Sequence, residues 1–507
     1  LRTTHLMMKN CSNWPSTLAL GAALISAPAL HAGTDVWFTP LTGSAPVVNP
    51  NDLEELSAPW VAPEGLIQVN WVSLAEVENA VLSPGQSIQR VPGAGTSASM
   101  FDMLACHPSG SHIFIPHETA TGAGVTRYNI YSNFAELLFA GDASGNWATD
   151  FGAFDPCRWT PNNTLFLAEE WSGQGRVIEV LNPMADLSQE SIQTRELNSI
   201  PNVAHEGINF SLKYKNTIYF IDEFNSGSIY KFVMTKRGDY TKGQAFVLQV
   251  DDFISSGGVS SNDYNSGPNA TATREGAATW VPLTDKNGIK LDSITTDPFQ
   301  NSPLGGRLAA DEAGGTPFGR PEDMIVSRLA NGHEVLYVTL TSEQRVISIE
   351  IVNTNKGTYK GGQAIVRTFL SESGTPKNVG FPSTTGTLGS PDNLAIDGAG
   401  NIYVVEDNPN SSNVGGDVWF ARDTDNDGVA ESLDHFLSLR VDGSESTGMI
   451  FDPAVPTEFH ICVQHPDSTG LSGGLGDAVW TFNLSSIDNS DFIRSLTRGR
   501  FRRVTNQ

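Results

Sequence analysis

The chain has 507 residues, with 31 Lys and Arg against 56 Asp and Glu, and a formal net charge of −25. Nucleic-acid backbones are bound through clustered Lys and Arg, so this balance argues against a nucleic-acid partner. It suits a protein that collects cations, and the length fits one large domain or two medium ones.

The N-terminal segment is predicted to be a secretory signal peptide over residues 1–32. Basic residues precede a short apolar run from Leu18 to Leu30, and Ala32 closes a small-residue cleavage site. The run is too short to span a bilayer comfortably, so we expect no membrane anchor. The remaining chain is expected to be a periplasmic or extracellular monomer.

Residues 33–507 are predicted to form a single all-β domain, because short apolar runs bounded by turn residues recur throughout. One unit repeats: an acidic residue, an apolar strand, a polar turn, a second apolar strand, and another polar or acidic residue. We call the leading acidic residue of each copy its first acid. The first acids are Asp102, Asp155, Glu206, Glu322, Asp392 and Glu445.

The spacing of the repeats predicts the architecture. Successive first acids are 53, 51, 116, 70 and 53 residues apart, and a four-stranded propeller blade takes roughly 40–50 residues. We therefore predict a six-bladed β-propeller with one long insertion, about residues 236–316, between the third and fourth repeats. A seventh blade inside this gap is the alternative.

A propeller brings equivalent positions of all blades to one central axis. The first acids should form a ring there, to which the ends of the second strands add Glu118, Glu169, Glu170, Glu223 and Asp407. Converging carboxylates repel one another and lose hydration, so they persist where cations neutralise them. Any single Asp at a turn has the alternative of capping that turn in solvent. The whole set predicts a central metal site.

The repeats resemble the PhoX-type alkaline phosphatases. The resemblance covers about residues 102–466 and is carried by PHET at 116–119, WTPNNTLFLAEEW at 159–171, HEG at 205–207, GRPEDM at 319–324, SPDNLAID at 390–397, ESTG at 445–448 and VQHP at 463–466. It implies a six-bladed propeller with iron and calcium on its axis that hydrolyses phosphate monoesters outside the cytoplasm.

The resemblance also implies roles for particular residues. Arg320 becomes the phosphate-binding group and, with Glu322, the catalytic pair. The implied metal ligands are Glu118, Glu169, Glu170, Glu206 and Glu322, and the ring adds Asp392. Hard carboxylate oxygens suit Ca²⁺ and oxidised iron, so we expect several Ca²⁺ ions, with Fe³⁺ as a further candidate.

This sequence departs from the family at two points. The family places a Cys ligand for iron five residues before the Thr-Pro of the second repeat, where this chain has Asp155, whereas Cys157 lies three residues before Thr160. Both remain candidate ligands, and we favour Asp155 because Cys157 alternates away from that position. No Arg-Arg pair precedes the apolar run, so general secretion is expected rather than the family's frequent twin-arginine route.

A second metal site is predicted in the sequence DTDNDG at 423–428. Asp423, Asp425 and Asp427 place oxygens at alternate positions, as in a calcium loop, and Asp434 stands at the twelfth position, where an EF-hand has Glu. The flanking sequences do not look like paired helices. We interpret the segment as a structural calcium loop, and the alternative is a solvated acidic turn.

The remaining signals refine the predicted site. We expect His117, His205 and His465 to support ligand carboxylates by hydrogen bonding. Cys106, Cys157 and Cys462 leave one disulfide open without choosing the pair. The predicted function is metal-dependent hydrolysis of small phosphate esters. The alternatives are another calcium-dependent propeller hydrolase, such as a lactonase, and a non-catalytic calcium-binding propeller. Arg320 discriminates, since only the phosphatase needs a phosphate-binding cation.

Overall fold

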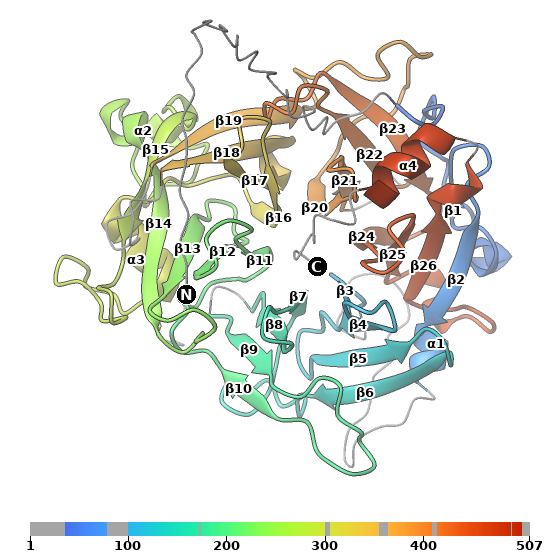
Figure 1. The fold of residues 1–507 in the computed structure, drawn as a ribbon, viewed down its shortest axis with the longest axis horizontal. Coiled ribbons are helices and arrows are strands. Elements are labelled where there is room, and N and C mark those ends of the chain that lie inside the picture. The colour runs from blue at the N-terminus through green and yellow to red at the C-terminus, as the bar shows by residue number, and fades with distance from the viewer. Residues whose placement is uncertain are drawn as a thin grey trace, which may run out of the picture. The chain divides into compact units, whose positions relative to one another are not determined.

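The computed structural model describes residues 36–78, 100–171, 174–299, 305–353, 363–407, 413–487 and 489–498. Their β-sheets are arranged like propeller blades around a central axis (Figure 1). The predicted signal peptide lies outside the described residues. Within the described ranges, no helix is both long and apolar enough to cross a membrane.

Four of the five sheets have four or five strands, and all their pairings are antiparallel. The first comprises β3 (Ala105–Cys106), β4 (His112–Pro116), β5 (Gly124–Asn129) and β6 (Phe134–Ala140). The second comprises β7 (Phe154–Trp159), β8 (Leu165–Glu169), β9 (Val177–Val180) and β10 (Thr194–Glu196). A third contains β20 (Pro391–Ile396), β21 (Ile402–Glu406), β22 (Asp417–Arg422) and β23 (Ser432–Leu439), and a fourth contains β24 (Glu445–Phe451), β25 (Glu458–Gln464) and β26 (Ala478–Asn483).

The fifth sheet has nine strands in the order β11-β12-β13-β14-β15-β19-β18-β17-β16. One half contains β11 (Ile208–Phe210), β12 (Thr217–Ile221), β13 (Ile229–Met234) and β14 (Gly243–Val250), and the other contains β16 (Pro321–Arg328), β17 (Glu334–Leu340), β18 (Arg345–Asn353) and β19 (Gln363–Ser371). The linking strand, β15 (Gly276–Pro282), lies inside the predicted insertion, as does β14. The predicted insertion therefore contains sheet strands.

The N-terminal region supplies strands that the sequence analysis left unassigned. β1 (Trp60–Val61) pairs with β23, and β2 (Gln68–Ser73) pairs with β26. Residues from the two ends of the described chain thus share sheets, which ties the ring of blades together.

The helices are short and lie between or beside the sheets. They are α1 (Leu74–Val77), α2 (Asp251–Ser255), α3 (Gly305–Ala313) and α4 (Ser490–Arg498). Single 3-10 turns are η1 (Pro50–Asp52), η2 (Glu54–Leu56), η3 (Gly267–Ala270), η4 (Thr341–Glu343), η5 (Asp467–Gly470) and η6 (Leu484–Ser486).

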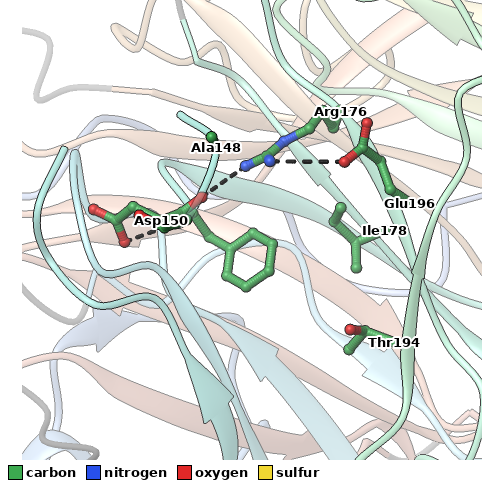
Figure 2. A pocket seen from close by; sticks show the side chains of 8 residues that line it. Ala148, Asp150, Arg176, Ile178, Thr194 and Glu196 are labelled. Atoms are coloured by element: carbon green, nitrogen blue, oxygen red, sulfur yellow. Dashed lines mark hydrogen bonds and ion pairs between the residues drawn. The ribbon is translucent and has the colours of Figure 1, made fainter. Parts of the chain in front are cut away.

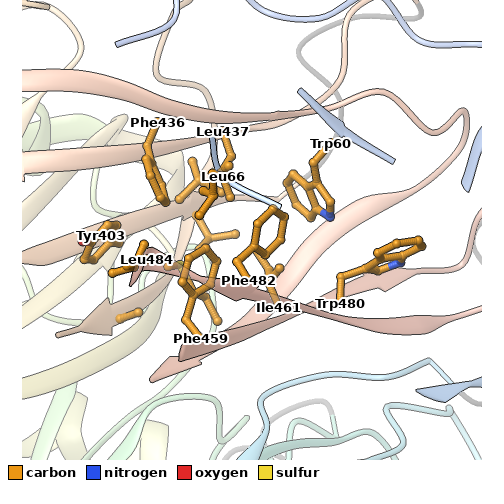
Figure 3. Close-up of a cluster of buried hydrophobic side chains, with 14 of the residues drawn as sticks. Trp60, Leu66, Tyr403, Phe436, Leu437, Phe459, Ile461, Trp480, Phe482 and Leu484 are labelled. Carbon is orange, nitrogen blue, oxygen red and sulfur yellow. The ribbon is translucent and has the colours of Figure 1, made fainter. Parts of the chain in front are cut away.

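The hydrophobic core is divided into clusters between neighbouring sheets, as expected when both faces of each blade are covered. Figure 3 shows one cluster, in which Trp60, Phe436, Phe459 and Phe482 bring together strands from both ends of the chain. The rings of Phe459 and Phe482 stack with centroids 4.8 Å apart. Cys106, Cys157 and Cys462 are buried free thiols, so no disulfide forms among them.

Candidate active site

The innermost strands of the sheets, β3, β7, β11, β16, β20 and β24, surround the axis (Figure 1). A β-bulge interrupts three of them at the first acid, because two residues stand opposite one on the neighbouring strand. The bulged pairs are Asp155-Pro156 in β7, Glu322-Asp323 in β16 and Asp392-Asn393 in β20. Bulges redirect side chains, and the Pro in β7 is tolerated because a bulged residue need not donate to the ladder.

A repeated backbone hydrogen bond holds the two acids of a repeat at one level. In the second repeat the Glu170 amide donates to the Ala153 carbonyl at 2.8 Å, and Ala153 lies two residues before Asp155. The same bond, at 2.8 to 3.0 Å, joins Glu118 to Met100, Glu223 to Ala204 and Asp407 to Ser390. Each acceptor lies two residues before a first acid, so the strand ends converge.

In the second and third repeats, two consecutive acidic residues at the end of the second strand face in opposite directions. In the second repeat the Glu169 carboxylate faces Arg176, whose Nε and Nη2 donate at 2.7 Å, whereas Glu170 interacts with Glu118 and Glu223. In the third repeat Asp222 is bound by Arg307, and Glu223 pairs with Arg320. The structure therefore places Glu169 in a buried ion pair rather than at the axis, which differs from the prediction.

Three carboxylates, those of Glu206, Glu322 and Asp392, are grouped tightly enough to hold one metal ion. Each offers one oxygen, and these oxygens lie within 4.8 Å of one another. The further acidic residues that interact electrostatically around them are Asp102, Glu118, Asp155, Glu170, Glu223, Asp407 and Glu445. We call the complete set the axial carboxylates.

Burial and like charge both oppose ionisation of the axial carboxylates. Burial raises the pKa of Asp155 well above its usual value, and Asp102 and Glu118 raise it further. Burial raises the pKa of Asp392 to about 7, although Glu206 and Arg320 counteract part of the rise. Cations in the cluster would remove this penalty, since opposite charge favours the ionised form.

Two axial oxygens lack a hydrogen-bond donor among the described residues: Asp155 Oδ1 and Glu322 Oε1, both from buried side chains. Arg320 Nε lies 2.8 Å from Glu322 Oε1, close enough for an ion pair but not aligned as a hydrogen bond. Buried oxygens of this kind normally find a partner. A donor set made only of carboxylates fits Ca²⁺ and Fe³⁺.

Arg320 is an arginine whose guanidinium lies among the axial carboxylates. Besides Glu322, it forms ion pairs with Glu223 and with Asp407, the latter at 3.6 Å. Its backbone φ of 53° is left-handed, as it is at Ala153 and Ser390, which occupy the same position two residues before a first acid. This conformation costs a non-glycine residue of the order of 1 kcal/mol. The Arg320 side chain is 37% exposed, so a ligand can reach it.

Buried polar residues connect the inner strands beneath the axial carboxylates. Asp323 accepts from Arg158 at 3.2 Å and from the Leu394 amide at 3.0 Å. Asn393, in β20, accepts from the amide of Gly448, in β24, at 2.8 Å, and this bond joins the third and fourth sheets. Asp323 and Asn393 are the second residues of the bulges, and the sequence analysis did not select them because only the bulge distinguishes them.

Cys157 lies outside the axial set. It follows the bulge in β7 and packs in a hydrophobic cluster with Phe154 and Leu167, and burial raises the pKa of its thiol. Asp155 holds the axial position. The two residues therefore lie in different surroundings, because the bulge at Asp155-Pro156 interrupts the strand between them.

The three predicted supporting histidines differ in surroundings. His465 Nε2 lies 3.1 Å from Glu445 Oε1; burial disfavours its charged form, but the contact with Glu445 outweighs this and raises its pKa to about 9. His117 Nε2 lies 2.9 Å from the Thr126 hydroxyl. His205 is fully buried, and burial lowers its pKa to about 3.

The 423–428 segment forms a turn beside β22. Asp423, Asp425 and Glu431 bring carboxylate oxygens within 4.8 Å of one another. Asp427 instead accepts the Val429 amide at 2.9 Å, and Asp434 is bound by Arg422 through two 3.0 Å contacts. Glu431 therefore takes the place in this group that the sequence analysis gave to Asp427.

A cavity of about 180 Å³ lies at the outer part of the second sheet, away from the first acids. Figure 2 shows Arg176 at its edge, bonded to the Asp150 carbonyl and facing Glu196, with Ile178 and Thr194 nearby. None of its lining residues is an axial carboxylate, so the cavity is distinct from the candidate site.

Fold and site together define a propeller-like protein whose axis carries a buried, oxygen-rich site with one arginine. The family model for the alkaline phosphatase PhoX matches residues 145–467. Because this match covers more than half of the chain, the protein belongs to the PhoX alkaline phosphatase family and is an enzyme of that class.

Solved structures resemble the chain at low sequence identity. Pseudomonas fluorescens PhoX, in complex with the transition state analogue vanadate, is 14% identical with a TM-score of 0.57, over 89% of this chain and 99% of that one. A Xanthomonas campestris gluconolactonase is 10% identical with a TM-score of 0.39, over 89% and 99%. The PQQ-bound aldose sugar dehydrogenase of Streptomyces coelicolor is 12% identical with a TM-score of 0.38, over 78% and 98%. No curated protein sequence matches the chain.

Proposed function

We propose that this phosphatase hydrolyses small phosphate monoesters at a metal cluster held by the axial carboxylates. The observation that carries the proposal is the convergence of Glu206, Glu322 and Asp392 beside Arg320, within a larger set of buried acids. A phosphate ester needs cationic partners for its oxygens, and buried acids need cations to remain ionised.

The proposed metal ligands come from the axial carboxylates. Glu118, Asp155, Glu170, Glu206, Glu322 and Asp392 are kept from the predicted ligands. Glu223 and Asp407, which the sequence analysis placed in the ring without naming them as ligands, are added because both pair with Arg320. Glu169 and Cys157 are not proposed as ligands. The all-oxygen set favours several Ca²⁺ ions and retains Fe³⁺ as a candidate. When bound, such cations polarise phosphoryl oxygens and lower the pKa of coordinated water.

Arg320 is proposed to bind the phosphate group. Its guanidinium is planar and can donate two parallel hydrogen bonds to phosphate oxygens. The ion pairs to Glu223 and Asp407 hold the side chain over the axis before substrate arrives, which reduces the entropy lost on binding. Glu322 connects the metal site with the phosphate-binding residue, because it belongs to the cluster with Glu206 and Asp392 and also lies beside Arg320.

We further propose that the propeller has six blades, with the nine-stranded sheet counted as two blades joined at their outer edges by β15. The insertion between the third and fourth repeats then begins after β14, near residue 251, rather than near 236. We also propose that residues 1–32 direct export to the periplasm or the cell exterior. A separate structural calcium site is proposed at Asp423, Asp425 and Glu431.

The proposal is tested on the purified protein by measuring bound calcium and iron and the hydrolysis of p-nitrophenyl phosphate. We expect bound metal, turnover that chelation abolishes, and recovery when Ca²⁺, with or without Fe³⁺, is restored. Bound metal without turnover would leave a non-catalytic metal-binding propeller, and turnover unaffected by chelation would contradict the metal cluster. Hydrolysis of a lactone instead would favour the lactonase alternative.

A further inference from the structure

We propose that helix α3 organises the axial site through Arg307, a positioning residue for Glu206 and Glu223. The proposal rests on the metal centre proposed above, because it treats these two carboxylates as ligands. Helix α3 lies in the segment between the third and fourth repeats, for which the repeat pattern itself provides no role.

Arg307 forms a buried two-point ion pair with Asp222. Its Nε and Nη2 lie 2.6 and 2.7 Å from the two Asp222 oxygens, and Asp222 is fully buried. The guanidinium also lies 3.7 Å from the centre of the Phe224 ring. Because the contact uses both carboxylate oxygens, it fixes the orientation of Asp222 as well as its position.

Asp222 in turn joins the backbone segments that carry two axial carboxylates. Its Oδ1 accepts the Ala204 amide at 3.1 Å, and the Glu223 amide donates to the Ala204 carbonyl at 2.8 Å. Ala204 lies two residues before Glu206. One buried carboxylate therefore sets the relative position of Glu206 and Glu223.

The second repeat contains a similar arrangement without a helix, although the amide that is accepted lies one residue earlier than the counterpart of Ala204. Glu169 corresponds to Asp222 and accepts the Gly152 amide at 3.2 Å, while its partner Arg176 comes from the residue just before β9. The Glu169 amide donates to the Arg176 carbonyl, as the Asp222 amide donates to the Ser228 carbonyl. Ser228 thus occupies the position of Arg176 in the third repeat. A serine is too short to supply a guanidinium, and Arg307 supplies it from α3.

The test compares Arg307→Ala and Arg307→Lys with the wild type, after metal has been removed by chelation. We expect Arg307→Ala to speed hydrogen exchange at the Ala204 and Glu223 amides while leaving that of the Glu170 amide unchanged. Ca²⁺ titration should show roughly tenfold weaker binding in the axial component, identified by its loss in Glu322→Gln. Lys keeps the charge but not the two-point geometry, so its effect should be intermediate.

The matched control is Arg195→Ala, which breaks an ion pair with Glu179 on the outer strands of the second sheet. It should alter neither readout. Ser228→Arg combined with Arg307→Ala places the guanidinium where the second repeat has it and should restore both. This double variant also serves if Arg307→Ala does not fold.

Unchanged exchange at Ala204 and Glu223 in both Arg307 variants would overturn the positioning role. A global rise in exchange that includes the Glu170 amide, without rescue by Ser228→Arg, would also overturn it. A wild type that binds no Ca²⁺ would instead reject the proposed metal centre, and the exchange data would then decide the positioning role alone.

Discussion

Arg320 and Glu223 form an ion pair although they are 97 positions apart in the sequence. Arg320 lies just before β16 and Glu223 just after β12, so the contact joins the third and fourth repeats at the axis. Among the described residues, Arg320 is the only arginine seen to form ion pairs with axial carboxylates. The ion pair with Glu223 keeps the Arg320 side chain where a phosphate can reach it.

Replacement of Arg320 should therefore damage catalysis more than stability. We expect Arg320→Lys to lower kcat/KM for p-nitrophenyl phosphate by about 10-fold or more, because lysine cannot make two parallel contacts. Arg320→Gln should lose more. Arg367→Lys, whose side chain pairs with Glu350 on outer strands, is the control and should retain activity. Steady-state kinetics decides the matter, and an unchanged kcat/KM in Arg320→Lys would argue against phosphate binding by this residue.

Glu322 and Glu169 are both buried glutamates but should respond differently to the same substitution. Glu322→Gln removes charge from the axial set, so bound metal and turnover should both fall sharply. Glu169→Gln breaks the buried pair with Arg176, which should lower the free energy of unfolding by about 3 kcal/mol. At saturating Ca²⁺ it should keep its bound metal.

Metal analysis together with urea unfolding separates these two effects. If Glu322→Gln keeps its full metal content and activity, it is not part of the site. If Glu169→Gln loses metal that excess Ca²⁺ does not restore, the assignment of Glu169 to a purely structural ion pair is wrong.

The position of the family's cysteine ligand can be tested directly. Asp155 occupies the axis and Cys157 the hydrophobic core, where burial raises the pKa of the thiol and disfavours a metal-binding thiolate. We expect Cys157→Ala to retain metal content and turnover and Asp155→Asn to lose both. Elemental analysis and activity assays suffice, and loss of iron on Cys157→Ala alone would restore the thiolate as a ligand.

Lys231 predicts a pH dependence of stability that is independent of the metal site. It is buried in β13 with its ammonium 4.7 Å from the Phe246 ring and 4.8 Å from the Trp280 ring, and burial lowers its pKa from 10.5 to about 7. Between these values the unfolded chain binds more protons than the folded one, so the free energy of unfolding should rise with pH from about 7 to about 10.

The measurement is urea unfolding at pH 7 and pH 9.5 for the wild type and Lys231→Met. The variant should be more stable at pH 7, because no ammonium must be deprotonated or desolvated, and its stability should change less between the two values. An equal change in both proteins would show that Lys231 is not the titrating group.

Much of the site was predictable because it depends on a repeated position. Asp155, Glu206, Glu322 and Asp392 were selected by their places in the repeat, and the structure brings them together with Arg320. Alternation along a strand could also have separated Glu169 from Glu170, because consecutive residues face opposite ways. The signal was present, but two adjacent glutamates gave no indication of which one had an arginine partner.

Other features depend on contacts that no local pattern records. Asp323 and Asn393 lie in β-bulges, which form where two residues of an inner strand stand opposite one residue of the neighbouring strand. Strands β1 and β2 are short and acquire their conformation by pairing with β23 and β26, far along the chain. Helix α3 contributes through Arg307, whose partner Asp222 is 85 residues away. Sequence spacing predicts repeats well and predicts such long-range additions poorly.

The most direct test of the central claim is an anomalous-scattering crystal structure of the protein grown with Ca²⁺ and a phosphate analogue. We predict metal peaks among Glu206, Glu322 and Asp392, with the anion contacting Arg320. Metal confined to the 423–431 loop, with no peak among the axial carboxylates, would contradict the account.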